Sequence, residues 1–72
     1  MEIHWGSGSG FNLGRIPGTS IRVERMKNWD KTWSFLLSDD QYTYLHVDSD
    51  KYVTVQEMTN GVFSWLAMKG RI

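Results

Sequence analysis

The chain has 72 residues, of which 40% are hydrophobic and 14% aromatic, and its eight basic and eight acidic residues give a formal net charge of zero. This length allows one small domain with a correspondingly small core, and the absence of cysteine excludes disulfides, thiolate metal sites and a cysteine nucleophile. The zero net charge removes the simplest argument for nucleic-acid binding, because phosphate-binding domains usually have a basic excess.

Residues 1–5 lack the basic start and apolar run of a signal peptide, and no window approaches the ~18 apolar residues of a membrane span. We therefore expect a cytoplasmic protein with no membrane partner. Residues 2–5 are long enough for one short strand.

A glycine-rich stretch follows. Five of the seven glycines lie within residues 6–19, and we interpret this segment as flexible, with residues 6–10 either a native loop or an engineered linker. A phosphate-binding loop is disfavoured, because the strand before it, the helix after it and the Lys-Ser/Thr pair are missing. Pro17 and Gly18 predict a turn.

Three strand-like runs come next, at residues 21–27, 32–38 and 41–47, each with side chains that alternate in character. The polar stretches between them are short enough for hairpins. These runs predict an antiparallel meander of three strands, or four if residues 2–5 join it.

An amphipathic helix is predicted over residues 55–69. Thr54 and Glu57 have the spacing of a capping box, in which each side chain satisfies a backbone N–H of the other residue. Apolar residues then recur at intervals of three and four, and Gly70 stands where a helix favours a left-handed residue. Only Gly61 argues against the helix, at about 1 kcal/mol in an interior position.

The predicted fold is therefore α+β, a single domain over residues 1–72 in which a three- to four-stranded antiparallel meander packs on one C-terminal helix (β-β-β-α). This order of elements is similar to that of integrase arm-binding and AP2-type DNA-binding domains. The likeness lies in the architecture and in no specific motif, so it implies only an analogy of fold.

Two-residue loops at residues 29–30 and 39–40 would sort the side chains onto two sheet faces. The face expected to pack on the helix holds Ile21, Val23, Leu36, Leu45 and Val47. The face expected to stay uncovered holds Arg22, Glu24, Met26, Trp33, Phe35, Leu37, Tyr42, Tyr44 and His46. The alternative is that the helix packs on this aromatic face, and a three-residue loop at either hairpin would also exchange the faces.

No group of residues predicts catalysis, a cofactor or a metal. The aspartate pairs 39–40 and 48–50 are about 24 Å apart along an extended strand, so they cannot share one ion, and aspartates favour turns for their own hydrogen bonds. His4 and His46 lack the spacing of a zinc site, and no nucleophile elbow is present. We expect a protein that is not an enzyme.

The leading hypothesis is a protein-binding module, an inhibitor or adaptor of the kind that mobile elements such as phages encode, because Trp, Tyr, Met and Arg are enriched at interfaces. The second hypothesis is nucleic-acid binding by the sheet, and the third is a homodimer formed through the same face. The predicted partner-binding residues are Trp29, Trp33, Phe35, Tyr42, Tyr44, Met26, Arg22 and Arg25.

Overall fold

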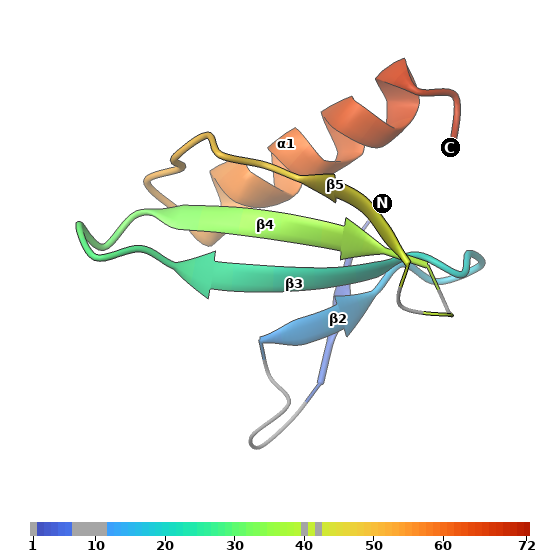
Figure 1. Ribbon diagram of the computed structural model, residues 1–72, viewed down its shortest axis with the longest axis horizontal. Coiled ribbons are helices and arrows are strands. Elements are labelled where there is room, and N and C mark those ends of the chain that lie inside the picture. Colours follow the sequence, from blue (N-terminus) through green and yellow to red (C-terminus); the bar gives the residue numbers. More distant parts are fainter. Residues whose placement is uncertain (1, 7–11, 40, 42) are drawn as a thin grey trace.

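The structure is a computed structural model that describes residues 2–6, 12–39, 41 and 43–72. Within these residues, five strands form one antiparallel meander that is followed by one helix (Figure 1). The α+β arrangement is thus confirmed, with one or two strands more than expected. The elements are β1 (His4–Trp5), β2 (Leu13–Arg15), β3 (Arg22–Lys27), β4 (Trp33–Ser38), β5 (Tyr44–Val47) and α1 (Val55–Met68).

Helix α1 has the ends that its capping residues predict. The Thr54 hydroxyl accepts a hydrogen bond from the Glu57 backbone N–H at 3.1 Å, as the capping box predicts. The Glu57 carboxylate accepts its bond at 3.2 Å from the backbone N–H of Val53, one residue before the expected donor Thr54. At the other end Gly70 has a φ of 71°. The N–H groups of Gly70 and Arg71 donate to carbonyls of the last turn at 3.1 and 2.9 Å, which is the Schellman arrangement.

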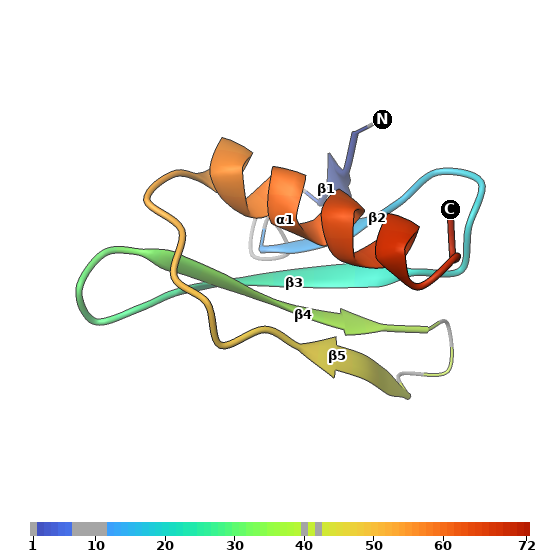
Figure 2. The same cartoon turned by 90° about the horizontal axis from the view of Figure 1, so that it is seen from above.

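Helix α1 covers the sheet face that carries Phe35 and Leu37 (Figure 2). The expectation that Leu36 and Val47 pack on the helix while Phe35 stays uncovered is therefore wrong, whereas Val23 packs there as expected. The buried hydrophobic residues come from the strands, their connections and three successive turns of the helix: Ile3, Ile16, Ile21, Val23, Phe35, Leu37, Met58, Val62 and Leu66.

The cause of this exchange is the turn between β3 and β4. Lys27 lies opposite Trp33, so the turn has five residues, 28–32, where a two-residue loop would place Met26 opposite Trp33. A slip of one residue moves every side chain of a strand to the other face. Phe35 and Leu37 of β4 therefore share the helix-covered face with Val23. For this strand, the alternative expectation that the helix packs on the aromatic face is correct.

Strand β2 lies inside the segment 6–19 that the sequence marks as flexible. Its Gly14 lies opposite Trp5 of β1 and Val23 of β3. A Cβ on Gly14 would lie 2.6 Å from the Ile3 side chain and 2.8 Å from the Trp5 ring, so glycine lets these two side chains cover the strand. The predicted turn is confirmed, with Gly18 at a φ of 80°, while most of the run 6–10 lies outside the described residues.

Candidate binding surface on the open face of the sheet

We call the sheet face opposite α1 the open face, because none of the described elements lies over it. Its side chains form two rows that cross the strands. The first, which we call the basic row, joins one residue of every strand through direct pairing: His4, Arg15, Arg22, Ser38 and Tyr44. The second, which we call the apolar row, lies two residues further along β2, β3 and β4, and three along β5, where the register shifts beside Leu37 and Ser38. It holds Leu13, Glu24, Leu36 and Val47.

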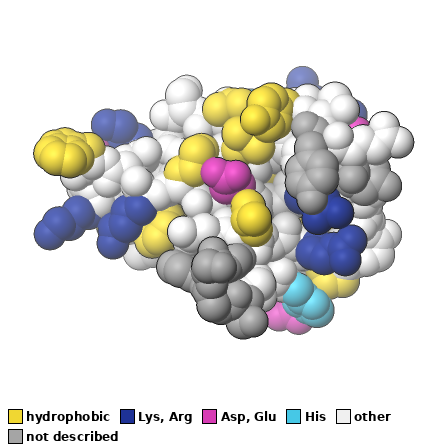
Figure 3. Space-filling model, turned by 60° about the horizontal axis from the view of Figure 1, so that its bottom comes forward, with side chains coloured by type: hydrophobic (Ala, Val, Ile, Leu, Met, Phe, Trp, Pro, Cys, Tyr) yellow, Lys and Arg dark blue, Asp and Glu magenta, His cyan; other side chains and the backbone are white. Residues whose placement is uncertain are grey.

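A groove of about 510 Å³ runs over both rows. It is lined from all five strands, so it crosses the strands and does not follow any one of them. Figure 3 shows this side of the molecule, where hydrophobic side chains surround an acidic one and Lys or Arg side chains lie beside them. Three apolar side chains of the face are strongly exposed, Leu13 at 55%, Tyr44 at 70% and Val47 at 57%.

Two arginines stand side by side in the basic row. Arg15 and Arg22 are opposite each other on neighbouring strands, so the row carries two positive side chains about one strand spacing apart. His4 lies on the far side of Arg15, and its Nε2 is 3.2 Å from the Glu2 carboxylate. The one carboxylate of the apolar row belongs to Glu24, which is exposed at the centre of the sheet.

The predicted partner-binding residues divide between several places. Arg22, Met26 and Tyr44 lie on the open face, as expected. Phe35 is fully buried under the helix, so it cannot contact a partner, and this corrects its placement on an uncovered face. Tyr42 lies outside the described residues.

Arg25 and Trp33 lie on the other face, beside the helix. The Arg25 guanidinium is 4.4 Å from the ring centroid of Trp5 and 5.6 Å from that of Trp33, and the Lys27 ammonium is 5.3 Å from the Trp33 ring. Trp33 is half-buried against the core. These residues form a stacked cluster of cations and aromatic rings that is separate from the open face.

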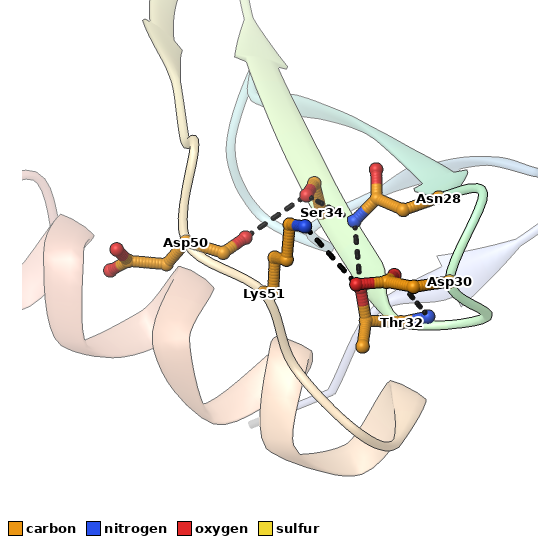
Figure 4. A network of polar contacts seen from close by, with 6 residues as sticks. All are labelled: Asn28, Asp30, Thr32, Ser34, Asp50 and Lys51. Carbon is orange, nitrogen blue, oxygen red and sulfur yellow. Dashed lines mark hydrogen bonds and ion pairs between the residues drawn. The ribbon is translucent and has the colours of Figure 1, made fainter.

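Trp29 stands fully exposed at the tip of the β3–β4 turn, which a polar network holds (Figure 4). The Asn28 amide donates to the hydroxyls of Thr32 at 3.0 Å and Ser34 at 2.9 Å, and the Asp30 carboxylate accepts from the Thr32 hydroxyl at 2.5 Å and from Lys51 at 3.1 Å. These hydrogen bonds, first the one from the Thr32 hydroxyl and then the one from Lys51, lower the pKa of Asp30 to about 2.

Sequence reasoning missed Leu13, Arg15, Leu36 and Val47 as surface residues. The first two stand in β2, where Gly14 between them suggested a loop, and the alternation of a three-residue strand is too short to recognise. The other two were assigned to the opposite face by the slip at the turn.

The aspartates serve turns, as predicted. The Asp39 carboxylate accepts from the backbone N–H groups of Gln41 and Thr43 at 2.9 and 2.8 Å, and the Asp48 carboxylate accepts from that of Asp50 at 2.7 Å. No group of three or more metal-ligating side chains is found among the described residues.

A scan against protein-family models finds no matching family, and searches of curated proteins and of solved structures find no match. In the described part of the chain, no helix has the length and apolar character needed to cross a membrane.

Proposed function

We propose that this chain is a small protein-binding module, an inhibitor or adaptor, that receives a segment of another protein on its open face. The observation that carries the proposal is the parallel course of the basic row and the apolar row through one groove. The occupant that fits has acidic side chains for the first row and apolar side chains for the second.

The composition of the face supports a protein partner. Tyr, Met and Arg are enriched in protein–protein interfaces, and Tyr44, Met26, Arg15 and Arg22 all stand on this face. Apolar side chains that stay exposed together mark interaction sites more often than isolated ones do.

The charges support an acidic partner segment. Arg15 and Arg22 stand side by side in the basic row, and guanidinium groups bind carboxylates with two parallel hydrogen bonds. Glu24 lies in the middle of the same face, where it repels a continuous polyanion but accommodates a protein segment that places a lysine or arginine there.

The experiment is a selection of peptides from a random display library on the immobilised chain. Selected peptides are expected to compete with one another and to lose binding to Leu36→Glu and to Tyr44→Ala, which both alter the open face. Ala67→Glu places the same charge on an exposed position of α1 and is expected to leave binding unchanged. Peptides that bind Leu36→Glu and Tyr44→Ala as well as the unaltered chain would overturn the proposal, provided that circular dichroism shows both variants folded.

Nucleic-acid binding is the second candidate, because Arg15, Arg22 and Tyr44 of the basic row carry groups that donate hydrogen bonds to phosphate oxygens. A titration with single-stranded oligothymidine separates the two candidates. Phosphate binding weakens steeply as salt concentration rises, so tight oligonucleotide binding with that salt dependence and a loss in Arg15→Ala would favour nucleic acid over a protein segment.

Light scattering behind size exclusion tests the third hypothesis, a second copy of the chain on the open face. A monomer is expected for a module whose face receives another protein. A dimer that Leu36→Glu converts to monomer would assign the open face to self-association and contradict the proposal.

A further inference from the structure

We infer, on the basis of the proposed function, that the segment received by the open face is an α-helix that lies across the five strands with an acidic stripe along one side. The inference follows from what a sheet face offers, from the spacing of its rows and from the order of its charges.

A sheet face presents side chains, while the backbone groups of its strands are already paired within the sheet. An extended segment on such a face leaves its own N–H and C=O groups without regular partners, which is costly where water is excluded. A helix satisfies its backbone internally, and helices are therefore the elements that cover sheet faces in folded domains. Helix α1 covers the other face of this sheet in that way (Figure 2).

The dimensions fit a short helix. Five strands at about 4.8 Å spacing measure about 19 Å across, which is the length of about 13 helical residues at 1.5 Å each. The basic and apolar rows lie about 7 Å apart along the strands. A helix with its side chains is about 10–12 Å in diameter, so one helix is wide enough to cover both rows.

The repeat of a helix also matches the repeat of the rows. Side chains at positions i and i+3 or i+4 of a helix are about 5–6 Å apart, close to the spacing of neighbouring strands. Acidic residues at i and i+4 can therefore face Arg15 and Arg22 together, because these two stand on adjacent strands in one row.

The second stripe of the helix is fixed by the apolar row. Leu13, Leu36 and Val47 call for apolar side chains, and Glu24 between them calls for one lysine or arginine. The expected occupant thus carries an acidic stripe beside an apolar stripe that is interrupted once by a basic residue.

The test uses the peptides selected on the open face, synthesised in isolation. They are expected to carry acidic residues at i and i+4 and to gain helical circular dichroism when they bind. Arg22→Glu is expected to weaken binding by about tenfold or more, since like charges then face each other. A peptide with lysine in place of the facing acid should recover the affinity for this variant. Lys69→Glu makes the same charge reversal at the C-terminal end of α1 and serves as the matched control.

The outcomes separate this inference from the proposed function. Peptides that need Leu36 and Tyr44 but bind without gaining helix, or whose binding ignores Arg22→Glu, would overturn the helix and leave a protein-binding face. If no selected peptide depends on the open face, the inference and the proposed function both fail.

Discussion

The phenol group of Tyr52 occupies the space that a Cβ on Gly61 would need. A Cβ built there would lie 2.5 Å from the Tyr52 hydroxyl oxygen and 2.7 Å from the ring carbon that bears it. The ring is held from two sides, because its hydroxyl donates to Asp48 at 2.9 Å and the Tyr52 backbone pairs with Trp33. The glycine that argued against a helix in the sequence is therefore the position where the chain before α1 packs on it.

Gly61→Ala is expected to destabilise the fold by about 1–3 kcal/mol, because an added methyl group displaces the Tyr52 ring. At an open helix position the same change stabilises by about 1 kcal/mol. Urea denaturation measures the difference. In a Tyr52→Ala background the sign should reverse, and a Gly61→Ala variant that is more stable than the unaltered chain would contradict the packing described here.

Alkaline pH tests the same phenol. Burial first, and then the hydrogen bond to Asp48, raise the pKa of Tyr52 to about 12 from the ordinary 10.0. The folded state therefore holds the proton more tightly than the unfolded state. This contribution to stability is fully present below about pH 10 and is lost as the pH rises through 12. Denaturation curves of Tyr52→Phe are expected to depend less on pH in this window, while Tyr44→Phe, at an exposed position, keeps the dependence.

Acid pH tests the β3–β4 turn. The pKa of Asp30 is lowered to about 2 from 3.8, chiefly by the hydrogen bond from the Thr32 side chain, so the charged carboxylate stabilises the folded state. That stabilisation is present above about pH 4 and is lost as the pH falls through 2. Asp30→Asn should flatten the curve of unfolding free energy against pH in this range. Asp50→Asn is the matched control, because Asp50 joins the network through its backbone carbonyl, and an equal flattening in both variants would refute the assignment.

Gly14→Ala is expected to detach β1 from β2, since the new Cβ would meet two side chains and, at 3.2 Å, the backbone carbonyl of His4. Hydrogen exchange measures this, because the Gly6 N–H donates to the Leu13 carbonyl at 2.9 Å and should lose its protection. Gly18→Ala is the comparison variant, because it strains the backbone without meeting a neighbour: Gly18 has open space around it and a φ of 80°. It should lower stability without exposing Gly6, and unchanged protection of Gly6 in Gly14→Ala would contradict the close approach of the two strands.

The parts of this fold that the sequence predicted are those decided locally. Thr54, Glu57 and Gly70 stand at the two ends of one helix, and their bonds depend on neighbours a few residues away. The meander was visible because alternation marks each of its longer strands. Both features survive any arrangement of the rest of the chain.

The parts that escaped depend on contacts that the local pattern does not contain. The five-residue turn is fixed by Asn28, which reaches both Thr32 and Ser34, and by Lys31, whose φ is 70°. Lysine is not a residue from which a left-handed conformation is expected. The resulting slip hid half of the candidate site, since it moves Leu36 and Val47 to the open face. Tyr44 still lies on the open face, as expected, because the register shifts a second time between Leu37 and Ser38.

The meander order has a consequence for how the chain folds. Every strand pairs with its neighbour in sequence, so each hairpin closes over a short loop, and folds rich in such nearby pairings form quickly. The helix that covers Val23, Phe35 and Leu37 is synthesised after all five strands. Until α1 docks, a nascent sheet therefore exposes its most apolar face, and the interval between sheet formation and helix docking is when the chain is most liable to aggregate.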